Sequence, residues 1–198
     1  HSVVRRQRQM CIRDRRKADV PVLAFCEDVA ASGGYWLAAS ADEIYANGAS
    51  IIGSIGVVSA GFGFDRAIER LGIDRRVYTA GERKAILDPF RPEAEEDVAR
   101  LKSLQAEIHQ QFIAHVVERR GGRLKGAHED LFSGAFWSGE SAVGLGLVDG
   151  LGDCRSVVTR RFGEEVDLMT IQPKKKLFSG IGGLSGSMAG AAAASVVD

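Results

Sequence analysis

One serine of this chain lies where a nucleophile would be useful. Ser32 stands in VAASGGYWLAASAD, residues 29–42, between a short apolar run that predicts a buried strand and a segment that predicts an amphipathic helix. The amino end of a helix offers unpaired backbone N–H groups that favour a developing negative charge. Gly33 and Gly34 leave room for another backbone to approach. The pattern fits a nucleophilic serine, but helix capping by Ser32 explains the motif alone more economically, because serine caps are common.

A serine hydroxyl needs a base to remove its proton, and the sequence offers two kinds. His109, His115 and His128 lie in or after a predicted long helix, and nothing in the sequence pairs them with an acidic residue, so a Ser-His-Asp triad is unsupported. A lysine can replace histidine where burial removes its charge. Lys84 precedes the apolar residues 85–87, which could desolvate its ammonium. An exposed loop lysine is an equally good interpretation.

The elements that must position these residues alternate between strand and helix, which predicts an α/β domain. The most strongly predicted element is a helix from Pro92 to Arg120, because apolar residues recur there every three or four positions before Gly121 and Gly122. Strands are predicted within 19–27, on both sides of the Asn47-Gly48 turn in 42–58, at 74–80 and at 166–172. Further helices are predicted after Ser32, within 61–73, within 132–153 and near 154–162.

Composition excludes several classes of protein. The 198 residues suit one soluble domain, and 26 basic against 26 acidic residues give no net positive charge to attract nucleic acid. The three cysteines are too widely spaced for a disulfide framework or a zinc site, and they predict a reducing compartment. No apolar run approaches the roughly 20 residues of a membrane span, and the first residues lack the apolar core of a secretion signal.

Four segments in order, DVAASGGYWLAASADEIYA, GSIGV, AGERKAILDPF and GLVDGLG, resemble the SppA/SohB-type signal peptide peptidases. The resemblance runs from about residue 19 to about 165. It implies a crotonase-like (ClpP-like) α/β fold of repeated β-β-α units with a long helix, serine peptidase activity through a Ser-Lys dyad, and no metal or other cofactor. It also implies peptide substrates, such as cleaved signal peptides, and ring-like or dome-like homo-oligomers.

The same resemblance assigns roles to residues. Ser32 would be the nucleophile, Lys84 the general base, and Ser54 the hydroxyl that orients the lysine without charging it. The backbone N–H of Gly33 would form part of the oxyanion hole. The small and apolar residues Gly34, Ile55 and Gly56 suit a groove for an extended peptide, although core packing explains them about as well. Asp88, the nearest acidic residue, is expected to point away from the amine, because a nearby anion favours the charged form of a lysine.

The chain departs from the family pattern at its beginning. Family members carry an SPGG-like glycine turn upstream of the serine, and this sequence has none. We therefore expect a truncated copy, with residues 1–18 a basic leader outside the family domain, 19–172 the peptidase domain and 173–198 a flexible Gly/Ala/Ser tail. The expected location is the bacterial cytoplasm or the inner membrane, reached through an anchor upstream of this segment.

Two rival functions stay open at this stage. A crotonase-type acyl-CoA enzyme would share the fold, but it needs no pairing of serine and lysine. A scaffold or interaction subunit that has lost activity fits the departure from the family pattern at the start of the chain. Reaction of Ser32 with a fluorophosphonate separates these alternatives from a peptidase.

Overall fold

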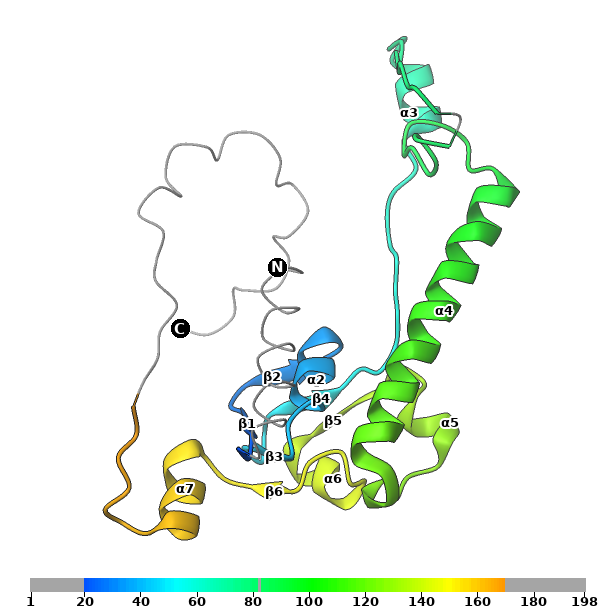
Figure 1. Cartoon of the computed structure of the whole chain (residues 1–198). Helices are drawn as coiled ribbons and strands as arrows, with labels where there is room; N and C mark the ends of the chain where they lie inside the picture. The colour runs from blue at the N-terminus through cyan, green and yellow to red at the C-terminus, as the bar shows by residue number, and fades with distance from the viewer. Residues whose placement is uncertain (1–19, 82, 170–198) are drawn as a thin grey trace.

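The structure is a computed structural model that describes residues 20–81 and 83–169. Figure 1 shows two regions of different character. A core of two small sheets and short helices lies at one end, and an arm, defined as residues 57–94, lies at the other. The long helix α4 (Glu95–Arg120) runs between them. The α/β domain predicted from the sequence is confirmed.

The core contains two three-stranded sheets. The first has the order β1 (Leu23–Cys26), β3 (Glu43–Ala46), β6 (Gly150–Leu151), and all its pairings are parallel. The second has the order β2 (Val29–Ala31), β4 (Ile51–Gly53), β5 (Phe136–Ser138), with β2 and β4 parallel and β4 and β5 antiparallel. The first four strands thus alternate between the sheets: β1 pairs with β3 in the first sheet, and β2 pairs with β4 in the second.

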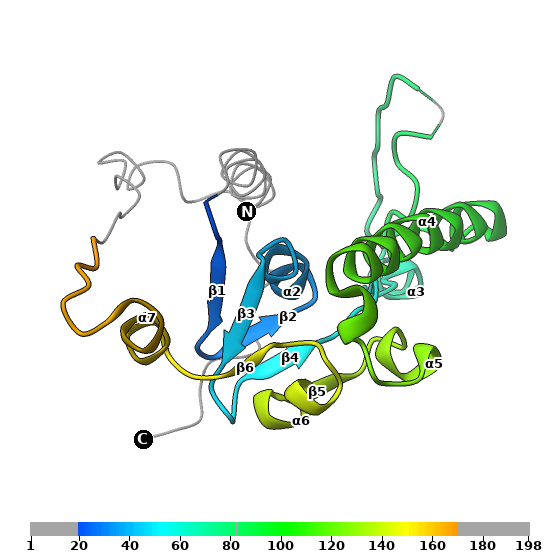
Figure 2. The same cartoon turned by 60° about the horizontal axis from the view of Figure 1, so that its bottom comes forward.

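Short helices pack against these sheets, as Figure 2 shows from below. The helix α2 (Gly33–Ala38) follows β2 directly, and its Tyr35 is fully buried. The Tyr35 hydroxyl donates a hydrogen bond to the carbonyl of Leu147 at 2.8 Å, which satisfies a polar group that would be costly to bury alone. The remaining short elements are α5 (His128–Leu131), α6 (Gly139–Gly144), α7 (Cys154–Phe162) and the 3₁₀ turn η1 (Gly121–Arg123).

Helix α4 belongs to the core only at its carboxyl end. Its buried residues are Phe112, Ile113, Val116 and Arg120, all in the last nine positions. Acidic side chains in its first turn and arginines in its last turn complement the helix dipole. Gly121 then adopts a φ of 50°, which ends the helix.

An ion pair fastens this end of α4 to the first sheet. The Arg120 guanidinium bonds both carboxylate oxygens of Asp149, at 2.7 and 3.1 Å, and the carbonyl of Gly146 at 2.9 Å. Asp149 also accepts from the Ile44 N–H at 2.7 Å. Burial alone would raise the pKa of Asp149, but these donors outweigh it and hold the pKa below its ordinary value.

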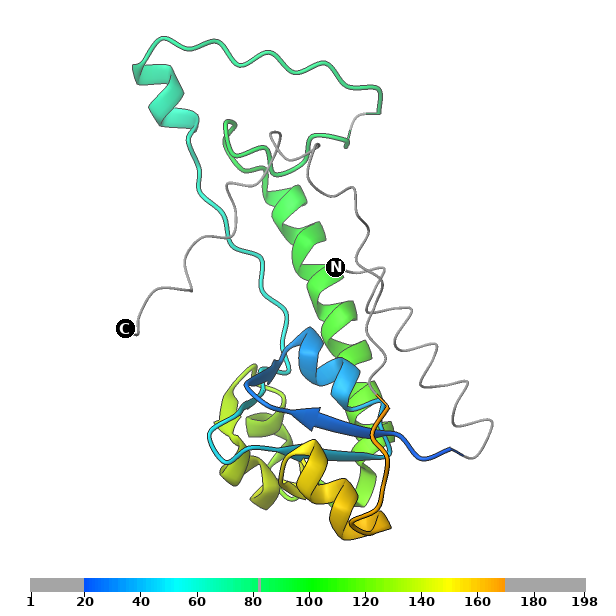
Figure 3. The same ribbon diagram turned by 90° about the vertical axis from the view of Figure 1, so that its left-hand side faces the viewer.

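The arm contains the short helix α3 (Asp65–Arg70), none of whose six described residues is buried. Figure 3 shows the arm standing away from both sheets, beside the amino-terminal half of α4. Large apolar side chains are exposed along it, including Val58, Phe62, Leu71 and Tyr78. The arm therefore gains little from the core that the rest of the chain builds.

Most predicted elements are present, with three corrections. The predicted strand at 74–80 is wrong, because this segment is extended in the arm and has no neighbouring strand among the described residues. The strands β5 and β6 fall inside 132–153, where only a helix was predicted. Residues 166–169 form no strand, and 170–172 lie outside the described residues. The predicted leader (1–18) and the whole predicted tail (173–198) also lie outside them.

Candidate functional site

Ser32 occupies a sharp turn between β2 and α2. Its φ is 52° and its ψ is −124°, a conformation that a residue with a side chain rarely adopts. Such a residue costs on the order of 1–3 kcal/mol, and strain of this kind clusters at functional sites. The side chain is exposed and, within the described part of the chain, makes no capping hydrogen bond. The capping interpretation is therefore wrong for the Ser32 hydroxyl, which is left available for chemistry.

The turn brings Ser32 next to Ser54. The Ser32 N–H donates to the carbonyl of Gly53 at 2.8 Å, at the carboxyl ends of the paired strands β2 and β4. Ser54 also has a positive φ, 51°, and its N–H donates to the carbonyl of Ala135 at 2.7 Å. A Cβ at Gly53 would lie 2.8 Å from the ring of Trp137, so glycine is required there. Two strained serines are thus held side by side by backbone bonds.

The three predicted groove residues, Gly34, Ile55 and Gly56, differ in how closely the rest of the chain packs around them. Ile55 is fully buried, and its carbonyl lies 3.0 Å from His109 Nε2, so Ile55 belongs to the core. A Cβ at Gly56 would lie 3.0 Å from the Cα of Gly134, which makes Gly56 a packing requirement of the chain itself. At Gly34 an added Cβ would meet the carbonyl oxygen of Val29 at 3.9 Å, an ordinary van der Waals contact, so a small side chain would fit there. Gly34 is therefore the groove candidate that packing does not explain.

Two histidines of α4 contact the backbone of the segments that follow Ser54 and Ser32, a role that the sequence did not predict. The Nε2 of His109 lies 3.0 Å from the carbonyl of Ile55, the residue after Ser54. The Nε2 of His115 lies 3.1 Å from the carbonyl of Trp36 and 3.3 Å from the Ser40 hydroxyl, and its ring stacks on Trp36. No local signal marks them, since residues six apart do not share a helix face and the partner carbonyls of Ile55 and Trp36 come from distant segments.

Lys84 lies in the arm, not beside Ser32. Its side chain is exposed, and its N–H donates to the carbonyl of Gly81 at 3.2 Å. Figures 1 and 3 place this part of the arm at the opposite end of α4 from α2. Within one chain the structure brings Ser32 and Ser54 together and does not bring Lys84 to them. The pairing of Ser32 with Lys84 stays a prediction.

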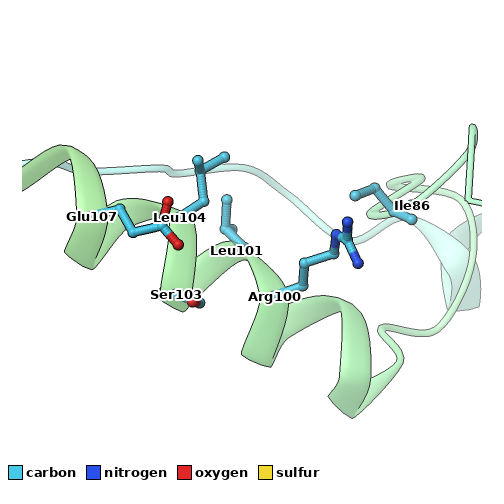
Figure 4. A pocket seen from close by; sticks show the side chains of 6 residues that line it. All are labelled: Ile86, Arg100, Leu101, Ser103, Leu104 and Glu107. Atoms are coloured by element: carbon cyan, nitrogen blue, oxygen red, sulfur yellow. The ribbon is translucent and has the colours of Figure 1, made fainter.

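A groove separates the Lys84 segment from α4. It has a volume of about 510 Å³, and Figure 4 shows Ile86 across from the helix side chains that line the other wall. The lining residues are Ile86, Arg100, Leu101, Ser103, Leu104 and Glu107. Since Ile86 and Leu104 remain exposed, this part of the molecule is incompletely packed.

Asp88 is turned toward other partners, as expected. Its carboxylate accepts from the Phe90 N–H at 3.1 Å and pairs with Arg75 at 3.3 Å. The Phe90 N–H and the Arg75 cation together hold the pKa of Asp88 below its ordinary value.

In residues 20–81 and 83–169, no group of three or more His, Cys, Asp or Glu side chains is arranged to hold a metal ion. No helix of this part combines the length and the apolar character that crossing a bilayer requires.

Comparisons with known proteins show which proteins this chain is similar to. The sequence profile of peptidase family S49 matches residues 14–167. A Brucella abortus protein named Na(+)/H(+) antiporter NhaA is 52% identical over 190 residues, 94% of this chain and 25% of that protein. A putative signal peptide peptidase SppA from Enterococcus faecium is 31% identical, covering 69% of this chain and 40% of its own length. A probable protease SohB from Buchnera aphidicola (strain APS) is 31% identical, covering 79% and 46%.

The chain spans less than half the length of each of these three relatives. The family match nevertheless covers most of the chain, and it includes Ser32, Ser54 and Lys84. The α/β architecture with its two sheets agrees with the crotonase-like fold that the resemblance implied. The chain belongs to peptidase family S49.

Proposed function

We propose that this chain supplies the catalytic part of a serine peptidase, with Ser32 as nucleophile and Lys84 as general base. The observation that carries the proposal is the geometry of Ser32: an exposed hydroxyl on a strained turn between strand and helix, free of any capping bond in the described chain. A strained strand-to-helix turn is one way in which enzymes expose a nucleophilic serine. Family membership supports the same chemistry.

In the proposed mechanism the Lys84 amine takes the proton of the Ser32 hydroxyl as Ser32 Oγ attacks the peptide carbonyl. The backbone N–H of Gly33 donates to the oxyanion. The proton passes to the leaving amine when the C–N bond breaks, which leaves an acyl-enzyme. Lys84 then takes a proton from water, the hydroxide attacks the ester, and Ser32 regains its proton.

The structure gives a reason to supply Lys84 from a second copy of the chain. A lysine acts as a base only where it is desolvated, and Lys84 is exposed here. The arm that carries it also exposes large apolar side chains, such as Phe62 and Tyr78, and leaves the groove beside Ile86 incompletely packed. A homo-oligomer in which arms pack against neighbouring copies would bury this surface and bring each Lys84 to a Ser32.

The proposed substrates are extended peptides, including remnants of signal peptides, the class named for the Enterococcus relative. The fold does not crowd Gly34, since an added Cβ would meet only the Val29 carbonyl oxygen, at 3.9 Å, and this leaves room for a substrate backbone beside the serine. Such peptides would be met in the bacterial cytoplasm or at the inner membrane.

Labelling of Ser32 with a fluorophosphonate, together with hydrolysis of a peptide library, tests the proposal. Ser32→Ala and Lys84→Ala should each lower hydrolysis by a factor on the order of 10³ or more. Lys102→Ala, which removes another exposed lysine, should change nothing. If the dyad forms between copies, mixing the two inactive variants should restore part of the activity.

Two results would contradict the proposal. Hydrolysis at the normal rate by Lys84→Ala would remove the lysine from the mechanism. A wild-type chain that neither labels nor hydrolyses would favour the non-catalytic interaction subunit, and turnover of an acyl-CoA thioester without labelling would favour the crotonase-type enzyme.

A further inference from the structure

Four residues form a cluster inside the arm, which we call the arm clamp: Phe64, Arg75, Asp88 and Phe90. Arg75 Nη2 lies 3.3 Å from Asp88 Oδ2, and its guanidinium carbon lies 5.2 Å from the centre of the Phe90 ring. Asp88 Oδ1 accepts from the Phe90 N–H at 3.1 Å. Phe64 packs on Phe90 with ring centres 5.6 Å apart, and its N–H donates to the carbonyl of Pro89 at 2.6 Å.

The shielding of one member, Asp88, distinguishes the clamp from the exposed ion pair beside it, although Phe64 and Arg75 each stay more than 40% exposed. The Asp88 side chain is only 5% exposed, although it is charged, and the Arg75 side chain is 44% exposed. A neighbouring pair, Asp74 with Arg76, lies 3.8 Å apart with both side chains largely in solvent. A carboxylate enclosed in this way is stabilised only while its donors stay in place. The clamp therefore ties three separate stretches of the arm into one unit.

The clamp is close to Lys84 along the chain. Lys84 precedes Asp88 by one turn-rich stretch, in which its own N–H bonds Gly81 and Leu87 adopts a φ of 55°. A positive φ at leucine is unfavourable and persists only where the surroundings enforce it. The clamp begins at the next residue, where the bonds of Asp88 to Arg75 and to the Phe90 N–H fix the chain that follows Leu87.

We infer that Arg75 and Asp88 are positioning residues for Lys84: they fix the arm segment that presents the lysine, and Arg75 keeps the Asp88 carboxylate away from its amine. The inference rests on the proposed function. A catalytic group must be held within about an ångström of its working position, and a misplacement of that size costs about 100-fold in rate. A carboxylate released near the lysine would also favour the charged amine, which is not a base.

The test measures the rate constant of Ser32 labelling by a fluorophosphonate between pH 6 and 10, on the full chain. Asp88→Ala and Arg75→Ala should each lower the rate about 100-fold at neutral pH. Arg75→Ala leaves the Asp88 carboxylate without its cation, and a free carboxylate near Lys84 favours the charged amine. The labelling rate of Arg75→Ala should therefore rise only at a higher pH than the labelling rate of Asp88→Ala. Asp88→Asn keeps an oxygen for the Phe90 N–H and should lose less, about tenfold. Arg76→Ala, in the exposed pair, is the matched control and should label at the wild-type rate.

The outcomes separate this inference from the proposed function. Wild-type rates in both Asp88→Ala and Arg75→Ala, with Lys84→Ala inactive, would overturn the positioning role and leave the dyad standing. A wild-type rate in Lys84→Ala would overturn both. If Asp88→Ala lowers the melting temperature of the core, the labelling rate of Asp88→Asn is used instead to judge the positioning role, since asparagine preserves the volume of the side chain. An equal pH profile in all the clamp variants would reduce Arg75 and Asp88 to a merely structural pair.

Discussion

The core and the arm of this molecule use their apolar residues in opposite ways. In the core, Tyr35, Ile44, Ile52 and Ile55 are fully buried between the sheets, α2 and α4. In the arm, Tyr78 is 91% exposed and α3 buries nothing among its described residues. The core is thus stabilised by its own contacts, while the arm presents apolar surface outward. The buried contacts keep the turn of Ser32 in place, while the exposed apolar surface of the arm is the surface that the proposed homo-oligomer would bury.

Helix α4 shows the same contrast within a single element. Its carboxyl-terminal half is packed on α2 and the sheets, with Phe112 stacked on Trp36 at 4.5 Å between ring centres. Its amino-terminal half buries no residue and carries the exposed Leu104. The comparison can be tested on this helix first, because secondary structure and propensity are nearly the same along it.

The largest expected effect is at Phe112. Phe112→Ala should lower the free energy of unfolding by about 3–5 kcal/mol, because it opens a cavity at a side chain that is 2% exposed. Leu104→Ala, at a side chain that is 52% exposed, should cost less than about 1 kcal/mol. Denaturant titration measures both. Equal losses would show that the two halves of α4 are not different in packing.

The ion pair that closes the core should give the next largest effect. Asp149→Asn removes the charge that faces the buried Arg120 and should cost about 2–3 kcal/mol, less than a wholly buried pair because Asp149 is partly exposed. Asp74→Asn in the arm should cost almost nothing, since its ion pair is exposed.

The same pair predicts a pH dependence. The folded-state pKa of Asp149 is lowered, so its contribution is fully present above the unfolded-state pKa of about 3.9 and is lost as the pH falls through the folded-state value. Melting temperatures should therefore drop below about pH 4, and Asp149→Asn should show a smaller drop. If the melting temperatures of the wild type and of Asp149→Asn fell in parallel with pH, the drop would not come from Asp149.

A smaller effect is expected at Ser32, where the core stores strain. Ser32→Gly should be about 1 kcal/mol more stable than Ser32→Ala, because glycine accepts a φ of 52° without steric cost. Both variants lack the hydroxyl, so both should be inactive, and the comparison isolates the backbone. A Ser32→Gly protein no more stable than Ser32→Ala would mean that the turn is not strained.

The smallest effect on stability is expected in the arm. Phe62→Ser and Tyr78→Ser should change the free energy of unfolding by less than about 0.5 kcal/mol, because both side chains are exposed. The same changes should weaken self-association, measured by sedimentation, if the arm packs on a second copy. Unchanged association would direct the search for a partner surface away from the arm.

Local patterns predicted much of the core. The Asn47-Gly48 turn between β3 and β4, the helix after Ser32 and the long helix α4 follow from signals within a few residues of each element. The strands β5 and β6 did not, because each is only two or three residues long and exists through pairing with β4 or β3. The segment 74–80 carries strand-forming residues and finds no strand to pair with in the described chain.

The sequence alone determined the family of the chain and predicted the residues that would do its chemistry, Ser32, Ser54 and Lys84, because residue type and order along the chain carry that information. Only the tertiary structure decided which of them meet: the pairing of β2 with β4 joins Ser32 to Ser54, and α4 carries the arm with Lys84 away from both. The physical reason is that a contact between distant segments depends on the path of the whole chain, which no local spacing encodes.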